Sequence, residues 1–396
     1  MSENIVITGI ARTPMGGFQG ALSDATAVQL GATAIAAALT RSGLQGDAID
    51  EVLMGCVLPA GLGQAPARQA ALGAGLPMSV GCTTINKMCG SGMKATMLAH
   101  DLLKAGSNRV MLAGGLESMS NSPYLLPKAR AGMRMGHAQA LDHMFLDGLE
   151  DAYDKGKLMG VFAENTAEQY GFTREQQDDF AITSLKRAQR AIEDGDFANE
   201  ITPVTLQSRK GETVIDTDEQ PFNANIEKIP QLRPAFRADG TVTAANSSSI
   251  SDGAAALVLM ANSEAEKRAL EPLAVIRAHA THAQEPAWFT TAPVAAINKV
   301  LDAAGWSADE VDLYEINEAF AVVTMAAISD LGLDHARVNV NGGACALGHP
   351  IGASGARIIV TLIAALQRRG LKKGVAALCI GGGEATAIAL ELVQAD

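Results

Sequence analysis

Strand-like apolar runs alternate with helical segments along most of this chain, and this alternation constrains the fold more than any other feature. Residues 4–10 predict a buried strand, and residues 24–42 predict a helix that stops at Gly43, because apolar side chains recur there every three or four positions. Further strands are predicted at 51–57, 83–86 and 109–113, and further helices at 66–74 and 92–105. The pattern predicts an α/β fold with helices on the faces of a sheet.

The composition changes between about residues 121 and 243, where charged residues replace the apolar runs. Residues 173–194 predict one amphipathic helix capped by Thr173. We interpret this stretch as an inserted unit with helices of its own, because a structureless loop of that length is uncommon. A strand at 253–260 then resumes the alternation, which continues to the C-terminus.

The two ends of the chain resemble each other. The segment 47–52 is similar to 307–312, in which Glu51-Val52 matches Glu310-Val311 at an offset of 259 residues, and Ser91-Gly92 matches Ser354-Gly355 at an offset of 263. Each Ser-Gly pair opens a helix that is followed by a strand running into glycines. We therefore predict an internal duplication, with functional sites where the two halves meet at strand ends.

Composition excludes several classes of protein. The chain has 396 residues, of which 48% are hydrophobic and 19% charged, so it can form a large core and is not disordered. A net charge of −12 disfavours general binding to nucleic acid. There is no uninterrupted apolar run of about 18 residues, so we expect no membrane span. Because no basic or Arg-rich leader precedes the first strand, we expect a cytoplasmic protein.

Five cysteines, without any CxxC pair, favour reduced thiols over a disulfide framework. Cys89 lies in NKMCGSGMK (86–94), where a short strand leads to a Gly-Ser-Gly turn that opens a helix. Amides at a helix start stabilise a thiolate, so we expect a lowered pKa for Cys89. A buried structural cysteine is the alternative there, and we prefer it for Cys56, which is predicted to lie within a strand.

Two further groups lie on strand-to-loop edges. His349-Pro350 lies in a glycine-rich loop before a helix, where proline suits the first helical turn and an imidazole stays neutral and able to act as a base. Cys379 ends an apolar strand (374–380) and precedes three glycines. Two thiols and one imidazole suggest acyl chemistry, with one thiol as nucleophile and one in proton transfer, although Cys379 could also be a core cysteine.

Other uses of these residues are disfavoured. The glycine-rich loop has neither the P-loop nor the dinucleotide spacing. Metal binding is the competing use of Cys and His, and we assign no metal site, because no two candidate ligands lie close in sequence; ligands distant in sequence are left open. The remaining six histidines have no comparable setting, and we assign them no role.

Long motifs in order resemble the thiolase family over the whole chain, and in particular its acetoacetyl-CoA (acetyl-CoA C-acetyltransferase) branch. These motifs are ARTP (11–14), NKMCGSG (86–92), GGLESMS (114–120), AENT (163–166), GTVTA (240–244), NEAF (317–320), NGG (341–343), GHPIG (348–352) and CIGGG (379–383). The resemblance implies duplicated α/β halves layered α-β-α-β-α with an inserted loop domain. It implies an N-terminal half at 1–120 completed by about 244–272, a loop domain at 121–243 and a C-terminal half at 273–396.

The resemblance also implies a reaction. Cys89 would be acetylated by acetyl-CoA after His349 takes its proton, and Cys379 would remove a proton from a second acetyl-CoA to give acetoacetyl-CoA; the reverse is thiolysis. His349 and a water held by Asn317 would stabilise the enolate, and the amides of Cys89 and Gly381 the tetrahedral oxyanion. No cofactor or metal is implied, because the CoA thioesters are substrates.

The same resemblance implies binding residues and an assembly. Coenzyme A would contact Met159, Phe236, Ala244, Ser248, Phe289, Ala319 and Phe320. Lys210, Lys228 and Arg233 are candidates for its phosphates. The protein would be a homotetramer, a dimer of dimers, with a tetramerisation loop at 120–142.

The chain departs from the usual family pattern in places. Leu158 replaces a histidine near the pantetheine arm, and Phe289 replaces a common methionine, which bears on tolerance for a 2-methyl group. Cys345 is interpreted as a small packing substitute. The alternatives are a broader-chain 3-ketoacyl-CoA thiolase of fatty-acid β-oxidation, a non-catalytic acyl-CoA-binding protein, and a thiol redox sensor. Ketoacyl synthases and hydroxymethylglutaryl-CoA synthases are disfavoured by the CIGGG sequence.

Overall fold

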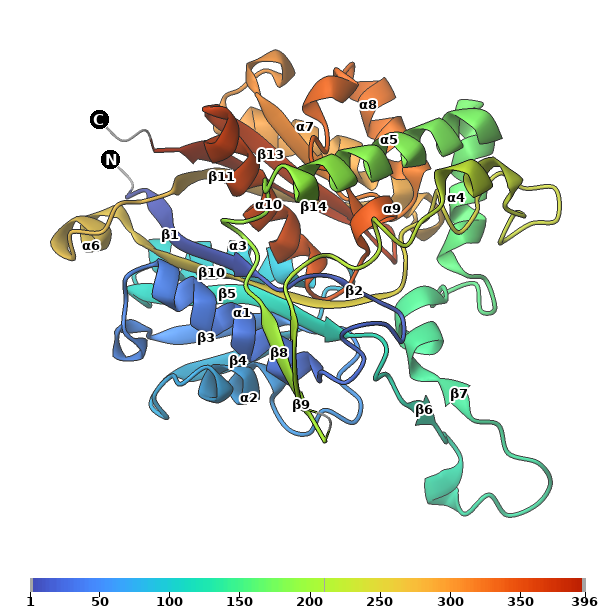
Figure 1. The fold of residues 1–396 in the computed structure, drawn as a ribbon, viewed down its shortest axis with the longest axis horizontal. Coiled ribbons are helices and arrows are strands. Elements are labelled where there is room, and N and C mark those ends of the chain that lie inside the picture. Colours follow the sequence, from blue (N-terminus) through green and yellow to red (C-terminus); the bar gives the residue numbers. More distant parts are fainter. Residues whose placement is uncertain (1–2, 210, 394–396) are drawn as a thin grey trace.

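The centre of the molecule is one mixed sheet, seen in a computed structural model that describes residues 3–209 and 211–393 (Figure 1). Its strands run in the order β12-β13-β14-β11-β1-β10-β5-β3-β4, with short β2 beside β10. The strands are β1 (Ile5–Arg12), β2 (Gly16–Gly17), β3 (Glu51–Gly55), β4 (Gly81–Ile85), β5 (Val110–Ser118), β10 (Ser251–Ala261), β11 (Ala274–Ala283), β12 (Leu313–Ile316), β13 (Lys373–Ile380) and β14 (Glu384–Leu392).

The sheet consists of two halves joined where β1 pairs antiparallel with β11, and the order β1-β10-β5-β3 is repeated as β11-β14-β13-β12; among the described strands only the first half adds a further edge strand, β4. In the first half β3 runs parallel to β5, and β10 is antiparallel to β5; β12, β13 and β14 repeat this arrangement in the second half. Asp50 accepts the amides of Arg109 and Val110, and Asp312 accepts those of Lys372 and Lys373. The duplication is therefore confirmed.

The matching carboxylates Asp50 and Asp312 correct one predicted register. They lie 262 residues apart, so the offset of 259 inferred from the segments 47–52 and 307–312 was wrong by three positions. The error arose because two similar acidic strings were aligned by letter. The turns that precede β3 and β12 set the true register, since Asp50 bonds to the start of β5 and Asp312 to the start of β13, the parallel neighbours of these strands.

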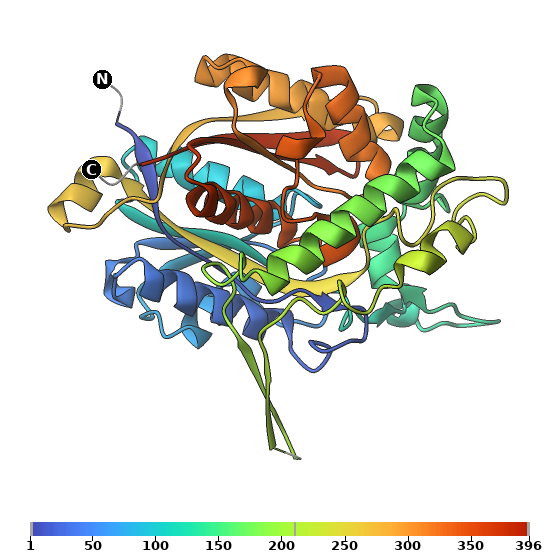
Figure 2. The same ribbon diagram turned by 45° about the horizontal axis from the view of Figure 1, so that its top comes forward.

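Helices cover both halves and fill the space between them (Figure 2). They are α1 (Ala27–Arg41), α2 (Pro66–Gly73), α3 (Ser91–Lys104), α4 (Met159–Tyr170), α5 (Arg174–Glu193), α6 (Asn262–Lys267), α7 (Ala292–Ala304), α8 (Ala321–Leu331), α9 (Ala344–Leu347) and α10 (Ser354–Arg369). One core lies under α1 and α2, and a second lies under α7 and α8. The central core packs α3 and α10 between the two halves, so the layers run α-β-α-β-α as expected.

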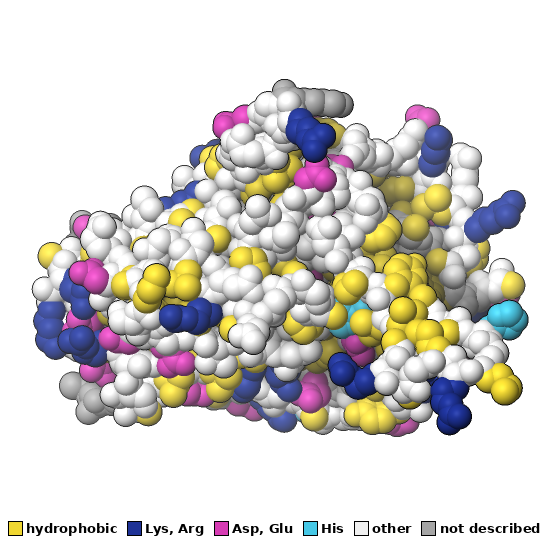
Figure 3. All heavy atoms as spheres, turned by 90° about the horizontal axis from the view of Figure 1, so that it is seen from below, with side chains coloured by type: hydrophobic (Ala, Val, Ile, Leu, Met, Phe, Trp, Pro, Cys, Tyr) yellow, Lys and Arg dark blue, Asp and Glu magenta, His cyan; other side chains and the backbone are white. Residues whose placement is uncertain are grey.

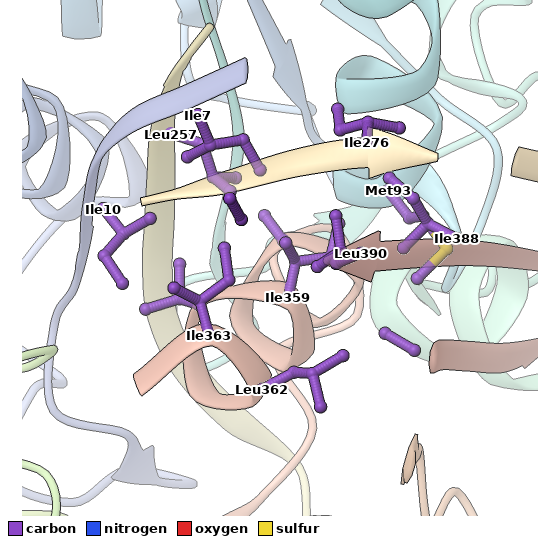
Figure 4. Packing of buried hydrophobic residues seen from close by; sticks show 14 of the residues in the cluster. Ile7, Ile10, Met93, Leu257, Ile276, Ile359, Leu362, Ile363, Ile388 and Leu390 are labelled. Atoms are coloured by element: carbon purple, nitrogen blue, oxygen red, sulfur yellow. The ribbon is translucent and has the colours of Figure 1, made fainter. Parts of the chain in front are cut away.

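The central core is built from branched aliphatic side chains contributed by both halves (Figure 4). Ile7 and Leu257 come from the first half, Ile388 and Leu390 from the second, and Ile359 from α10. All five are fully buried or nearly so. Because α3 and α10 both begin at the same end of this core, the loops that precede them lie close together.

The inserted region carries α4, α5 and two small hairpins, formed by β6 (Tyr124–Leu125) with β7 (Leu141–Asp142) and by β8 (Val204–Ser208) with β9 (Gly211–Ile215). The predicted Thr173 cap of α5 is confirmed, because its side chain accepts the amide of Gln176. Within the part of the chain that the structure describes, no helix is both long and apolar enough to cross a bilayer.

Two local expectations need correction. Cys56 does not lie within a strand, because β3 ends at Gly55 and Cys56 is the first residue beyond it. Pro350 does not occupy the first turn of α10, which begins at Ser354. A tight turn intervenes, in which the carbonyl of Pro350 accepts the amides of Ala353 and Ser354.

Candidate active site

Cys89 lies on a sharp turn between β4 and α3. Met88, just before it, has φ 47°, a left-handed conformation that a side chain of this size rarely adopts. The turn is held by side chains on either side, since Asn86 Oδ1 accepts the Met88 amide at 2.9 Å and Ser91 Oγ accepts the Lys87 amide at 2.8 Å. The local sequence thus fixes the direction of the thiol.

His349 is held in one tautomer by its neighbours. Its Nδ1 lies 2.6 Å from Ser354 Oγ, and that hydroxyl donates to the carbonyl of Pro350 at 2.9 Å. With the Ser354 hydroxyl proton on that carbonyl, His349 Nδ1 donates to Ser354 Oγ, and Nε2 carries the free lone pair. Nε2 is buried and has no hydrogen-bond partner among the described residues, as a base awaiting a proton would be.

Cys379 is the next-to-last residue of β13, and the amide of Gly381 follows it. The backbone amides of Cys89 and Gly381 lie towards the Cys89 sulfur and lower the pKa of its thiol. Two donors that converge on the nucleophile are in place to hold an oxyanion formed on a carbonyl bonded to that sulfur. The contact also brings the two strand ends, one from each half, to a single point.

One cavity of about 350 Å³ collects the predicted residues. Eleven of the twelve line it: Cys89, Met159, Phe236, Ala244, Ser248, Phe289, Ala319, Phe320, His349, Cys379 and Gly381. Its wall is aromatic, since Phe236 packs edge-to-face on Phe320, and Phe289 packs on Phe162 in the same way. An apolar cavity with a few polar groups at one end suits a ligand with a slender chain and a reactive terminus.

Asn317 is the predicted residue that does not line the cavity. It follows the end of β12, is 1% exposed, and neither its Oδ1 nor its Nδ2 has a partner within the described chain. A buried amide without a protein partner is a typical site for a bound water. The position is compatible with the role that the family resemblance implies.

The electrostatics correct one expectation about Cys89. Burial is the largest effect and raises the pKa of Cys89 to about 11, although the amides of Gly381 and Cys89 lower it. The predicted lowering was wrong, because desolvation of the thiolate outweighs the helix start. Burial also raises the pKa of Cys379, and the charge of Cys89 raises it further. Burial lowers the pKa of His349 to about 3. The resting groups are therefore neutral.

Sequence reasoning missed two positioning groups. Ser354 carries no family signal beyond its place five residues after His349. Glu117 is fully buried and accepts the amides of Val57, Leu58 and Gly352, which ties the His349 loop to the first half. Burial raises the pKa of Glu117 to about 7 despite these bonds. Only the GGLESMS motif pointed to Glu117, and it gave no role.

The proposed phosphate contacts fall in different places. Lys210 lies outside the described residues. Lys228 lines a second hollow that adjoins the main cavity, since Ala244 and Ser249 border both. Arg233 is exposed nearby in the chain and lines neither. Lys228 is thus the candidate that the structure places beside the cavity.

Comparison with known families decides the identity of the fold. The family described as "Thiolase, N-terminal domain" matches residues 5–263, and "Thiolase, C-terminal domain" matches residues 270–392. The chain belongs to the thiolase family. This thiolase is 51% identical over 390 residues to an acetyl-CoA acetyltransferase of Pseudomonas aeruginosa, covering 98% of this chain and 99% of the relative.

Other relatives are similar over their full length. Acetyl-CoA acetyltransferase 2 of Arabidopsis thaliana is 52% identical over 395 residues, 99% of this thiolase and 98% of the relative. The crystal structure of the Bacillus anthracis acetyl-CoA acetyltransferase matches with a TM-score of 0.96 at 43% identity, covering 99% of both chains. An Ascaris suum thiolase in complex with coenzyme A matches with a TM-score of 0.93, also at 43% identity, covering 99% of this thiolase and 100% of that chain.

Proposed function

We propose that this thiolase is an acetyl-CoA acetyltransferase, which joins two acetyl-CoA molecules into acetoacetyl-CoA and CoA through an acetyl-Cys89 intermediate, and runs in reverse by thiolysis. The observation that carries the proposal is the meeting of two thiols, Cys89 and Cys379, with the free Nε2 of His349 at the end of one apolar cavity. The names of the full-length relatives support the choice of acetyl groups.

The first half-reaction acylates Cys89. The Cys89 proton passes to His349 Nε2 as the sulfur attacks the thioester carbonyl, and the amides of Cys89 and Gly381 hold the oxyanion. When the C–S bond to CoA breaks, the Cys379 thiol gives its proton to the departing sulfur. The enzyme is left with acetyl-Cys89, a protonated His349 and a Cys379 thiolate.

The second half-reaction forms the carbon–carbon bond. The Cys379 thiolate removes a proton from the methyl group of a second acetyl-CoA, and its raised pKa makes it a strong base. Protonated His349 and a water held by Asn317 stabilise the enolate, whose carbon attacks acetyl-Cys89. Collapse expels the Cys89 sulfur, which takes the proton back from His349, so all three groups return to their resting states.

Phe289 is proposed to set the size of the acyl site. It lines the cavity, is buried and packs edge-to-face on Phe162, so its ring forms part of the cavity wall. Leu158, which replaces a polar residue of the usual family pattern, lines the same cavity and keeps it apolar along the pantetheine arm. Short acyl chains should fit best, with a 2-methyl branch accommodated beside Phe289.

Thiolysis of three substrates tests this function: acetoacetyl-CoA, 2-methylacetoacetyl-CoA and a C8 3-oxoacyl-CoA. We expect kcat/KM for acetoacetyl-CoA to exceed that for the C8 substrate at least about tenfold, because a closed apolar pocket discriminates added methylenes by this order. We also expect measurable cleavage of the 2-methyl compound. Phe289→Met is the matched control, because it places the methionine that is common in the family beside the 2-methyl group. Preference for the C8 substrate would assign the protein to the broad-chain β-oxidation thiolases instead.

A non-catalytic acyl-CoA-binding protein is the second candidate, and the neutral resting state of all three groups is what such a protein would also show. It is disfavoured because the two amides aimed at the Cys89 sulfur have no use in binding alone. Absence of any turnover with all three substrates, together with bound acetyl-CoA, would favour it.

We further propose the remaining features that the resemblance implies. The protein needs no cofactor or metal for this reaction, acts in the cytoplasm in fatty acid metabolism, and assembles as a dimer of dimers through residues 120–142. The two-half sheet supports the division into units at 1–120 with 244–272, at 121–243 and at 273–396.

A further inference from the structure

A cluster of three ligand-type side chains lies away from the cavity. His100 and Asp101 lie near the end of α3, and His279 lies on β11. The atoms His100 Nδ1, Asp101 Oδ1 and His279 Nε2 form a triangle with edges of 3.0, 2.8 and 3.2 Å. Sequence reasoning missed it, because His279 is 178 residues from Asp101 and only the duplicated fold brings them together.

Hydrogen bonds cannot satisfy all three edges of this triangle. If His100 Nδ1 and His279 Nε2 both carry protons and donate them to Asp101, these two N–H groups face each other across 3.2 Å. If His100 Nδ1 carries a lone pair instead, that lone pair faces the Asp101 carboxylate at 3.0 Å. One contact is repulsive in either arrangement, whereas a cation that accepts a lone pair from each atom makes all three favourable.

We propose that His100, Asp101 and His279 bind a divalent cation of the zinc type. Two imidazole nitrogens and one carboxylate oxygen form a donor set typical of Zn²⁺ and disfavoured by Mg²⁺ or Ca²⁺. Ligand atoms in a tetrahedral zinc site lie about 3.3 Å apart, so the observed triangle needs to open only by a few tenths of an ångström.

The surroundings leave one coordination position open. The side chain of His100 is 8% exposed and that of His279 is 17% exposed, so the imidazoles are held by the fold, while Asp101 is 53% exposed. The exposed side gives an entry path and allows a water molecule as the fourth ligand.

The site would join the two halves of the molecule. His100 belongs to the helix that follows Cys89, and His279 belongs to the strand that pairs with β1 across the junction. His100 lies nine positions after Ser91 in the helix, or roughly 14 Å along the axis, so the cation would act on stability and not on the reacting groups.

Isothermal titration calorimetry with Zn²⁺ tests the proposal on the full-length chain. Cys89→Ser and Cys379→Ser are introduced into every sample, so that the thiols of the cavity cannot contribute. We expect one equivalent of Zn²⁺ to bind. His279→Ala and Asp101→Asn should each weaken the affinity at least about tenfold, since removing a ligand costs at least as much affinity as removing an outer-shell group that hydrogen-bonds to a ligand. His137→Ala, an exposed histidine on the 120–142 segment, is the matched control and should leave the affinity unchanged.

Each result bears on the proposal directly. No measurable Zn²⁺ binding, unchanged affinity in both ligand variants, or an equal loss in His137→Ala would overturn it. Asp101→Asn decides the matter if His279→Ala does not fold, because Asp101 is half exposed and the amide is nearly isosteric. A raised unfolding temperature with Zn²⁺ in the parent, absent from Asp101→Asn, would support it further.

Discussion

At the scale of single residues, the site is a set of neutral groups arranged around one sulfur. Burial outweighs the backbone amides at Cys89, and burial also keeps the His349 imidazole uncharged. The reactive thiolate therefore does not exist in the resting protein. It forms when the thioester arrives, because only then can the proton move to His349 Nε2 while negative charge passes to the carbonyl oxygen.

The pH dependence of Cys89 alkylation follows from these pKa values. The thiolate fraction rises tenfold per pH unit below the pKa of about 11, so the rate with iodoacetamide should climb steadily from pH 7 to 10. No step is expected near pH 6 to 7, because the pKa of His349 is near 3 and it stays neutral throughout. Peptide mapping by mass spectrometry follows the modified cysteine. A plateau at or below pH 8 would contradict the account and restore the lowered pKa expected from the helix start.

At the scale of elements, the site depends on how closely α3 and α10 cross. A Cβ added at Gly355 would lie 2.4 Å from the amide nitrogen of Met93, and one at Gly92 would lie 2.8 Å from that of Ala356. Neither glycine has a positive φ, so close approach and not backbone conformation requires them. The crossing sets the separation of the Cys89 turn from the His349 loop.

Gly355→Ala should therefore destabilise the protein, by about 1–3 kcal/mol from overpacking, although alanine in a helix is ordinarily the more stable residue. Chemical denaturation measures the change. Gly81→Ala is the control, since its added Cβ would meet only ordinary van der Waals contacts at 3.6 Å or more. Equal stability of Gly355→Ala and the parent would show that the two helices can separate freely.

The elements themselves were largely predictable, since α1, α2, α3, α5, β1 and β10 lie within a few residues of their predicted ranges. Local periodicity and caps such as Thr173 carry that information. Pairing of β1 with β11 was not predictable, because it depends on contacts between residues far apart in the chain. The same holds for Glu117 and the His279 cluster, and the pKa of Cys89 depends on burial that no local motif reports.

At the scale of the whole molecule, the duplicated halves place one thiol each at a shared edge, and the inserted region supplies the cavity wall. The segment 120–142 projects from this body (Figure 1). Large apolar side chains on it face solvent, with Met135 96%, Tyr124 67% and Leu126 52% exposed. In the view from below, apolar side chains gather on the right of the surface, the side on which this segment projects in Figure 1 (Figure 3). Such exposure is typical of a contact surface.

We expect light scattering to give a mass of four 41.0 kDa chains for the parent protein. Leu126→Ser combined with Met135→Ser should give two chains, because the apolar contact between dimers is lost. Met78→Ser, which removes an 82% exposed methionine elsewhere, should leave the tetramer intact. A parent of two chains, or a double variant that keeps four, would contradict the proposed role of the segment.

Acid-quenched mass spectrometry after mixing with acetyl-CoA tests the central claim most directly. We predict an acetyl adduct on the peptide that contains Cys89. We also predict that the adduct persists in Cys379→Ser while formation of acetoacetyl-CoA is abolished, because that variant keeps the nucleophile, CoA can leave as a thiolate without a proton from residue 379, and the strong base is lost. No adduct on the Cys89 peptide, or condensation that survives in Cys379→Ser, would contradict the account.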